Sequence, residues 1–347
     1  MKKLDIQGCG TIRVIYPYLL LNHFLYHNNK VSTGGTYLSN FIYDPMFYKN
    51  FTFVQFQRAA EDYHIHLYSH IIKEVRKYFK IPIIYEIDDM LFNIPKWNYA
   101  SDYYNKNEEN VKKLMEMSDA IIVSTPFLKK SFSNYNKKIS IIPNHLAKFV
   151  WGDIYPKHLN EPREKKPKII WAGSENHFSL KGNDGGDFGS KLIDFIKKTV
   201  DKYEWNLLGA CPSELNNFSD KIKIHSWVKI FQYPYYIKSI DADIGIAPLS
   251  NCDFNRCKSN IKALEYVACG IPGVYSDIDP YSNMTIKCGT EEYMISKIEE
   301  LASDIDMRSR TWEKDYKIVK SQLWWEEDNN LKKYVETYLN LFGKKLP

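Results

Sequence analysis

The sequence lacks any apolar run of about 18 residues, the length at which a segment becomes a candidate for a membrane-spanning helix. The nearest candidate, residues 14–26, is interrupted by Pro17, Asn22 and His23. The opening segment MKKLDIQGCG also carries Asp5 where a secretory signal needs an apolar stretch. We therefore expect no membrane span and no signal peptide, and we expect the protein to act in the cytoplasm.

Two signatures of bound groups are missing as well. The six cysteines are scattered, with no CxxC pair and no paired histidines at ligand spacing, so we expect free thiols and no metal site. The glycine-rich run 181–189 matches neither GxGxxG nor a Walker loop. The sequence therefore gives no indication of dinucleotide binding or of P-loop chemistry, and a surface loop is the alternative reading of that run.

The composition is that of a globular protein large enough for two domains. The 347 residues are 44% apolar and 26% charged. The net charge of +5 is unevenly distributed, because residues 1–150 hold 19 Lys or Arg against 13 Asp or Glu, a balance of +6. The remainder holds 28 against 29. A basic first half is compatible with an anionic partner, although it also arises by chance.

Short apolar runs alternate with segments of helical periodicity along the chain. The expected strands are 51–56, 81–87, 120–124, 140–143, 169–172, 205–209, 222–225, 242–248 and 272–275. The expected helices are 66–80, 107–118 (capped by Asn105), 189–203, 233–239, 259–268, 291–302 and a tail from 308 to 341. Residues 11–16 fit either a strand or the start of a helix.

This alternation indicates an α/β protein with parallel sheets covered on both faces. The pattern restarts after a charged segment with two prolines, 160–168, so we expect two doubly wound, Rossmann-like domains facing across a cleft. Ligands of such sheets bind outside the carboxyl ends of the strands, and there we look for chemistry.

The segment 242–281 carries the strongest signal. A strand ends in a polar loop that leads into a helix near Lys258 and Ser259. The free N–H groups and the dipole at a helix start attract phosphate, and Lys258 adds a positive charge. Glu265 follows two turns later, on the same predicted helix face, where a carboxylate can accept hydrogen bonds from a ribose diol. Taken singly, Lys258 and Glu265 also fit solvated surface side chains.

Two other strand ends carry small or acidic residues. Gly173 and Ser174 end the strand 169–172, where small residues let a phosphate approach the backbone. The strand 81–87 ends at Asp88 and Asp89. Because neighbouring residues of a strand point to opposite faces, the two carboxylates do not readily share one metal ion. We expect Asp88 to face the cleft and Asp89 to cap the following turn.

The pattern FNRCKSNIKALEYVACGIPGVYSD resembles the donor-binding motif of GT-B glycosyltransferases, particularly glycosyltransferase family 4 and its phage-borne relatives. The resemblance implies a GT-B fold with an acceptor domain at 1–150, a nucleotide-sugar domain at 151–318 and a C-terminal helix, 319–347, that crosses back to the first domain. It places the ribose on Glu265. Where many members have a second glutamate facing the donor sugar, this chain has Cys257.

The resemblance also implies roles for particular residues. Catalytic roles fall to Asp88 and Lys258, and acceptor binding falls to Asp89 and Trp97. Donor binding falls to Gly10, Arg13, Gly173, Ser174, His177, Asn255, Lys258, Ser259 and Glu265. The PN turn before His145 resembles the turn that ends the first domain, which makes a structural role for His145 the preferred one. No metal is implied, and a UDP-sugar is the expected donor.

The resemblance implies a glycosyltransferase that retains the anomeric configuration. The favoured acceptor is a 5-hydroxymethylated cytosine in phage DNA, which would place the protein in the host cytoplasm. The favoured rival is a bacterial surface-glycan glycosyltransferase that acts on lipopolysaccharide or capsule. A rival of another class is a non-catalytic nucleotide-sugar-binding protein, and an epimerase acting on the nucleotide sugar alone is a third. Stacking by Tyr99, Tyr103 and Tyr104 on a displaced base, and base recognition near Trp227, are further hypotheses.

Overall fold

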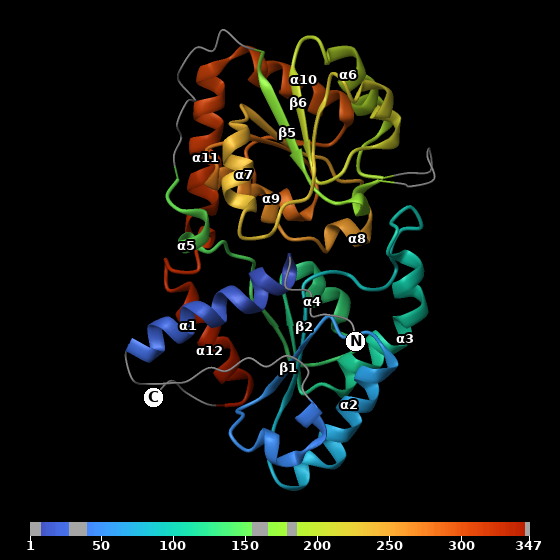
Figure 1. Cartoon of the computed structure of the whole chain (residues 1–347), viewed down its shortest axis with the longest axis vertical. Helices are drawn as coiled ribbons and strands as arrows, with labels where there is room; N and C mark the ends of the chain where they lie inside the picture. The colour runs from blue at the N-terminus through green and yellow to red at the C-terminus, as the bar shows by residue number, and fades with distance from the viewer. Residues whose placement is uncertain (1–7, 28–39, 155–165, 179–185, 344–347) are drawn as a thin grey trace.

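The chain folds into two layers of parallel β-sheet, one above the other, each covered by helices (Figure 1). The computed structural model describes residues 8–27, 40–154, 166–178 and 186–343, and the expected linker at 160–168 therefore lies mostly outside the described residues. Within these ranges no helix has both the length and the apolar character needed to cross a membrane. The α/β class and the parallel sheets are confirmed.

The first sheet has two fully buried central strands between two half-buried edge strands. It contains β1 (Val54–Gln57), β2 (Ile83–Ile87), β3 (Ala120–Val123) and β4 (Ile139–Ile141), in that order. Around it lie α1 (Tyr16–His27), α2 (Asp62–Lys73), α3 (Ser101–Met117), α4 (Pro126–Phe132) and α5 (Lys148–Trp151). Ile83 and Tyr85 pack on one face with residues of α2 and α3, whereas Ile84 packs on the other with Tyr16. Both faces are covered, so β2 and β3 are buried along their whole length, and every residue of the two strands except Glu86 is apolar or aromatic.

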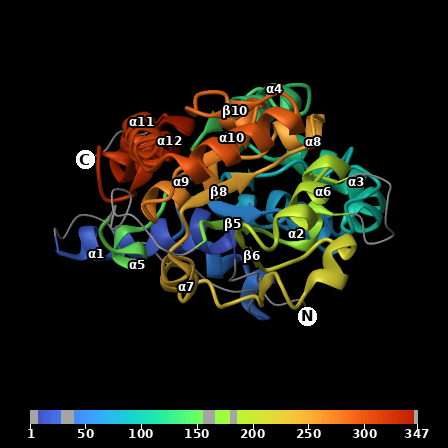
Figure 2. The same ribbon diagram turned by 90° about the horizontal axis from the view of Figure 1, so that it is seen from above.

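The second sheet reverses its strand order in the middle. Its strands are β5 (Lys168–Ala172), β6 (Glu204–Leu208), β7 (Lys223–His225), β8 (Ile244–Ala247), β9 (Gly273–Ser276) and β10 (Lys287–Cys288), in the order β10-β9-β8-β5-β6-β7. Its helices are α6 (Ser190–Thr199), α7 (Tyr233–Ile240), α8 (Asp253–Arg256), α9 (Ile261–Ala268) and α10 (Glu291–Ser303). Figure 2 shows β5 and β8 between α10 and α7. The order reverses between β5 and β8, and such a switch point is where doubly wound sheets bind ligands.

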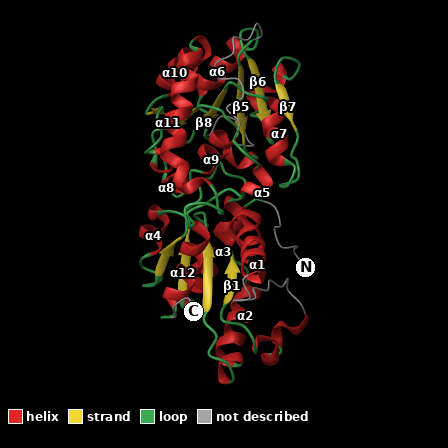
Figure 3. Cartoon of the chain, turned by 90° about the vertical axis from the view of Figure 1, so that its left-hand side faces the viewer, coloured by secondary structure: helices red, strands yellow, loops and turns green. Residues whose placement is uncertain are grey.

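The last two helices return from the second sheet to the first. α11 (Ile305–Leu323) packs on α9, and α12 (Asn330–Leu341) lies beside α1 (Figures 1 and 3). The Tyr338 hydroxyl donates to Gln55 Oε1 at 2.6 Å, and the Trp325 backbone N–H donates to the Leu146 carbonyl at 2.9 Å. These contacts bring the end of the chain back onto the first sheet. We propose 1–150, 151–318 and 319–347 as the division of the chain, with the last limit inside α11.

Most expected elements are present, with three differences. α3 begins at Ser101, so Asn105 lies inside the helix and does not cap it. The tail is two helices, because the chain leaves helical geometry from Trp324 to Asn329. Residues 11–16, left open by the sequence, form a π-helical turn (Thr11–Ile15) that continues into α1. Local periodicity located the elements, whereas their exact ends depend on tertiary contacts.

A buried arginine fastens α11 to the second sheet. The Nε and one terminal nitrogen of Arg308 donate to the carbonyls of Leu301 and Ala302 at the end of α10, both at 2.6 Å. The other terminal nitrogen lies 3.2 Å from Asp243 Oδ1, and Asp243 Oδ2 accepts from the backbone N–H of Lys168. One side chain therefore joins α10, α11 and the starting ends of β5 and β8.

We expect Arg308→Ala to lower the free energy of unfolding by about 3–5 kcal/mol, because Asp243 would remain buried without its cation. The measurement is urea unfolding followed by tryptophan fluorescence. Arg310→Ala is the matched control, since Arg310 is exposed and reaches Asp304 only at 3.5 Å. Equal shifts for both variants would contradict the role assigned to the buried pair.

Candidate active site

The carboxyl ends of the two sheets face each other, and the loops that follow the strands touch. Three hydrogen bonds cross between them: Asn98 Nδ2 to the Asn176 carbonyl at 3.2 Å, Thr125 Oγ1 to the Cys257 carbonyl at 3.1 Å, and Asn144 Nδ2 to Ser259 Oγ at 2.7 Å. Most of the residues that the sequence singled out lie on these loops. The fold therefore brings most of these residues together at the carboxyl ends of the strands, as the sequence analysis expected.

Asp187 organises the second-sheet side of this region. Its Oδ1 accepts from Asn255 Nδ2 at 2.6 Å and from the backbone N–H of Ser250 at 2.9 Å. Its Oδ2 lies 2.6 Å from His177 Nδ1. The carboxylate is completely buried, and these hydrogen bonds keep its pKa below the usual value although burial acts to raise it. Asp187 thus joins the loops after β5 and β8 to α8.

His177 is neutral in this arrangement. Its pKa is lowered to about 4, mainly by burial and also by the ammonium groups of Lys258 and Lys262, against the raising effect of Asp187. Because the ionised Asp187 only accepts hydrogen bonds, His177 Nδ1 carries the ring proton and Nε2 is left as an acceptor. A neutral imidazole with a free Nε2 suits a hydroxyl group better than a phosphate.

The start of α9 differs from the sequence-based expectation. The helix begins at Ile261, so Lys258 and Ser259 lie in the loop before it, and the prediction that Lys258 and Glu265 share a helix face was wrong. Lys258 is held instead by Phe254, whose ring centroid lies 4.8 Å from its Nζ. Gly173 and Ser174 directly follow β5, as expected.

Glu265 is buried rather than solvated. The Tyr233 hydroxyl donates to Glu265 Oε2 at 3.0 Å, and only 9% of the residue is exposed. Burial raises the pKa of Glu265 to about 7, although Lys262 and the tyrosine act to lower it. A carboxylate held in this way retains a second oxygen for another donor, such as a sugar hydroxyl.

Lys262 is a site residue that lies inside the sequence motif but that sequence reasoning did not select. Its Nζ donates to the Ala172 carbonyl at the end of β5 and lies 5.5 Å from the centroid of the Trp171 ring. Burial lowers the pKa of Lys262 to about 8, while Glu265 acts to raise it. It therefore supplies a second cation beside Lys258, one helical turn before Glu265.

On the first-sheet side, Arg58 holds both aspartates at the end of β2. Its Nε lies 2.8 Å from Asp88 Oδ1, and its terminal nitrogen lies 2.7 Å from Asp89 Oδ2. Asp89 is therefore an ion-pair partner, in place of the expected turn cap. Burial acts to raise the pKa of Asp88, but Arg58 and Arg13 outweigh it and lower the pKa. Arg58 follows β1 at a positive φ of 50°, an unusual conformation for a non-glycine residue.

Arg13 is buried and engaged with protein groups. Its Nε lies 2.7 Å from Glu86 Oε1, and a terminal nitrogen donates to Asn144 Oδ1 at 3.0 Å and to the Ile142 carbonyl. Asn144 donates in turn to Ser259, so Arg13 is linked to the loop before α9 through one intermediate residue. Gly10 is buried just before the π-helical turn that contains Arg13.

No protein-family model matches the sequence, and no curated protein matches it. Among solved structures, an alpha-glucosyltransferase in complex with UDP is similar, at 12% identity over 95% of this chain and 96% of that one, with a TM-score of 0.58. An alpha-glucosyltransferase with UDP and a 13-mer DNA containing an A:G mismatch is similar at 13% identity, with the same coverage and TM-score. S. aureus TarM, as a mutant with fondaparinux, alpha-GlcNAc-glycerol and UDP, is similar at 13% identity and a TM-score of 0.50.

The chain has the GT-B fold. Likeness at this identity establishes the architecture, whereas activity depends on the site. The alignment with TarM covers 79% of this chain but only 53% of TarM, so the chain spans about half the length of that protein.

Cys257 and Trp97 occupy the boundary between the two halves of this GT-B fold. Cys257 is fully buried and packs with Phe254 among the core residues of the first sheet, so no side chain with a sugar-binding carboxylate stands there. Trp97 is half-buried, and its ring is roughly perpendicular to the Phe254 ring, with the two ring centroids 6.5 Å apart. The Phe254 ring contacts both the Trp97 ring and the Lys258 ammonium group. These three side chains therefore connect the first-sheet side of the boundary to the loop before α9.

Trp227 lies at the carboxyl ends of β5 and β6. Gly209 has a φ of 100°, and a Cβ there would lie 2.5 Å from the Gly173 carbonyl and 3.2 Å from the Trp227 ring. Only glycine fits this position. The indole is 60% exposed, which leaves a flat apolar surface at the switch point of the sheet. His145 is structural, because its Nδ1 is 2.6 Å from the Gln322 carbonyl and its ring packs on Trp325.

The low pKa of His177 predicts acid sensitivity. Between pH 6.5 and 4 the unfolded chain binds a proton at this residue that the folded chain does not, so stability falls as the pH falls. We expect His177→Asn, which keeps a donor for Asp187, to make the pH dependence of unfolding shallower by about 1.4 kcal/mol per pH unit. Urea unfolding at several pH values measures it. His66→Asn, at an exposed position, is the control, and an equal change in both variants would contradict the assignment.

Proposed function

We propose that this protein is a glycosyltransferase that moves a sugar from a UDP-sugar to an acceptor hydroxyl. The observation that carries the proposal is the buried Glu265, held by Tyr233 beside Lys262, at the switch point of a GT-B fold. A carboxylate with one free oxygen fits a ribose diol, and cations beside it fit a diphosphate. Similar folds have been solved as glucosyltransferases with UDP bound, which supports a UDP-sugar donor.

Donor binding follows from these positions. The diphosphate would lie against Gly173, Ser174 and the start of α9, with Lys258 and Lys262 supplying positive charge. The ribose would take the free oxygen of Glu265. The exposed Trp227 ring would stack on the uracil, since an indole offers a flat apolar surface for a base.

The donor sugar would occupy the space between the sheets, where His177 Nε2 accepts a hydrogen bond from one of its hydroxyls. Asn255 and Ser259 would act indirectly, because Asn255 orients Asp187 and Ser259 is held by Asn144. Gly10 and Arg13 would act from the first-sheet side, with Arg13 positioning Asn144.

In the reaction, the bond between the sugar C1 and the diphosphate oxygen breaks, and C1 bonds to the acceptor oxygen. The proton of the acceptor hydroxyl passes to the departing diphosphate oxygen, which has taken the electron pair of the broken bond. Lys258 and Lys262 would stabilise the negative charge that develops on the diphosphate. Asp88 has a lowered pKa and is a weak base, so its role would be to orient the acceptor hydroxyl by accepting a hydrogen bond. The motif shared with glycosyltransferase family 4 supports retention of configuration.

We infer that the acceptor is a 5-hydroxymethylated cytosine in duplex DNA, bound near Asp89 and Trp97. Two observations support it: a neighbour of the same fold was solved with UDP and DNA, and the first half of the chain is basic. A base inside a duplex must leave the stack to reach a buried site, and aromatic side chains at the boundary would receive it.

The test is mass spectrometry of nucleosides after incubation with UDP-glucose and duplex DNA containing hydroxymethylcytosine. We expect the mass of the modified nucleoside to rise by one hexose. Donor hydrolysis without this gain would leave a glycosyltransferase with another acceptor, such as a surface glycan. Neither product, with UDP still bound, would overturn the proposed activity in favour of a non-catalytic binding protein.

We expect Glu265→Gln to weaken UDP binding by about 1–3 kcal/mol, a roughly fivefold to 150-fold rise in Kd. Because the pKa of Glu265 is about 7 and ribose hydroxyls favour the carboxylate, UDP affinity should rise from pH 6 to 8 more steeply in the native protein than in the variant. Calorimetry measures both. Glu299→Gln, on the surface of α10, is the control. An unchanged Kd for Glu265→Gln would remove this residue from the ribose site.

A further inference from the structure

The basic charge of the first half is concentrated in one acid-free segment. Between Asp119 and Asp153 the chain contains five lysines and no aspartate or glutamate. Four of them form two adjacent pairs, Lys129–Lys130 and Lys137–Lys138. We call these four side chains the basic edge, because β4, which directly follows the second pair, is the outermost strand on its side of the described sheet.

All four ammonium groups of the basic edge are exposed, and among the described residues no carboxylate lies within ion-pair distance of them. Lysines around the second sheet behave differently. Lys191, Lys202, Lys221 and Lys223 each face a carboxylate of their own neighbourhood. The positive charge of the basic edge is therefore not balanced by nearby carboxylates of the described residues, whereas the four lysines around the second sheet each have a carboxylate close by.

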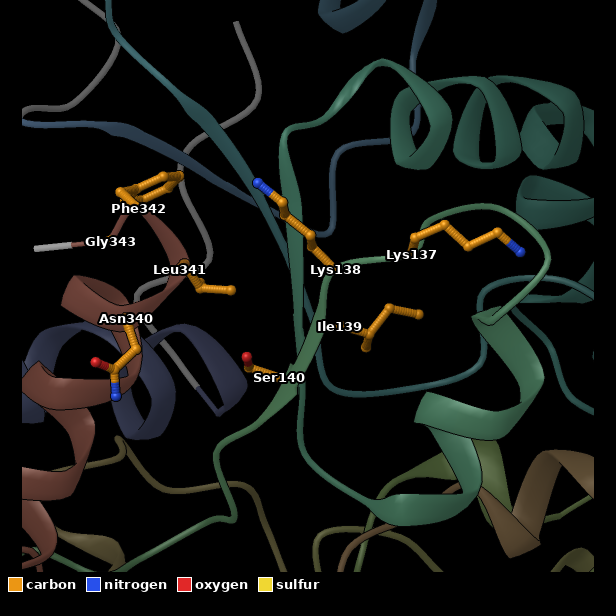
Figure 4. Close-up of a pocket in the computed structure, with 8 residues that line it drawn as sticks. All are labelled: Lys137, Lys138, Ile139, Ser140, Asn340, Leu341, Phe342 and Gly343. Atoms are coloured by element: carbon orange, nitrogen blue, oxygen red, sulfur yellow. The ribbon is translucent and has the colours of Figure 1, made fainter.

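A groove runs along the basic edge. It has a volume of about 710 Å³ and lies between β4 and the end of α12 (Figure 4). Lys137 and Lys138 line it at the start of β4, and Ser140 and Asn340 are further polar residues of its lining. Ammonium, hydroxyl and amide groups are the side chains that contact phosphate oxygens of nucleic acids.

The basic edge is connected to the cleft through α4. Thr125 caps this helix and donates to the Cys257 carbonyl, one residue before Lys258. Lys129 and Lys130 lie at the other end of the same helix, about 8 Å further on at 1.5 Å per residue. In Figures 1 and 3, α4 lies directly beneath α8, at the level where the two sheets meet.

We propose that the basic edge binds the phosphate backbone of duplex DNA and positions the duplex so that one base reaches the cleft. The proposal rests on the proposed glycosyl transfer to DNA and assigns the surface that holds that acceptor. DNA fits better than a membrane, because none of the large exposed apolar side chains among the described residues falls between 120 and 148. Membrane-surface binding needs apolar anchors as well as lysines.

The test compares two variants that each lose four positive charges. One is K129Q/K130Q/K137Q/K138Q, and the matched control is K191Q/K202Q/K221Q/K223Q. Fluorescence anisotropy measures the binding of a labelled hydroxymethylcytosine duplex, without donor, over a range of salt concentrations. We expect the affinity of the first variant to fall about tenfold or more, and its salt slope to become shallower by roughly 0.9 for each DNA phosphate that is no longer neutralised. The control should keep the native slope.

The outcomes separate this proposal from the proposed activity. Equal losses of affinity in both variants, or a native protein that does not bind the duplex at low salt, would overturn the basic edge as a DNA surface. So would unchanged DNA binding combined with loss of binding to anionic phosphatidylserine vesicles. UDP affinity and slow hydrolysis of UDP-glucose report on the donor site alone, and both should remain native in the first variant. If hydrolysis is absent in every protein while the salt slopes differ as expected, the proposed activity fails and the DNA surface stands.

Discussion

The donor side of this site depends on one buried carboxylate. Asp187 has no contact with solvent, and its oxygens are held by His177 in the connection after β5, by Ser250 in the loop after β8 and by Asn255 in α8. A buried charge of this kind is tolerated only when its oxygens are paired, so the three segments must be in place together. The same carboxylate decides which nitrogen of His177 carries the proton. Asp187 therefore determines both how these segments are arranged and which nitrogen of His177 can accept a hydrogen bond.

A second network ties the two sheets to each other. Arg13 holds Glu86 and Asn144, and Asn144 continues to Ser259 on the opposite side of the cleft. Arg58 likewise forms ion pairs with Asp88 and Asp89, which directly follow β2. Most of these groups are buried and paired with protein atoms, which makes them positioning groups. The side chains that retain capacity for a ligand are fewer, and they lie on the second-sheet side.

Glu265 and Lys262 differ from ordinary surface residues because both side chains are buried and both have shifted pKa values. Glu265 and Lys262 lie one helical turn apart, and burial raises the pKa of the acid to about 7 and lowers that of the lysine to about 8. Near neutral pH, Lys262 is therefore mainly a cation and Glu265 is divided between its acid and its carboxylate forms, so a ligand that offers hydroxyls to Glu265 favours the carboxylate. Perturbed groups of opposite sign beside a strand end are typical of a binding site.

The sequence by itself determined the alternation of strands and helices, the restart between the two halves and the motif around Glu265, because these follow from local periodicity and spacing. It could not determine that Arg58 pairs with Asp88, that Asp187 joins His177 to Asn255, or that Lys262 is buried. Those contacts join residues far apart in the chain or depend on what covers a side chain. Ion pairing and burial are properties of the assembled layers, and only the tertiary structure decided them.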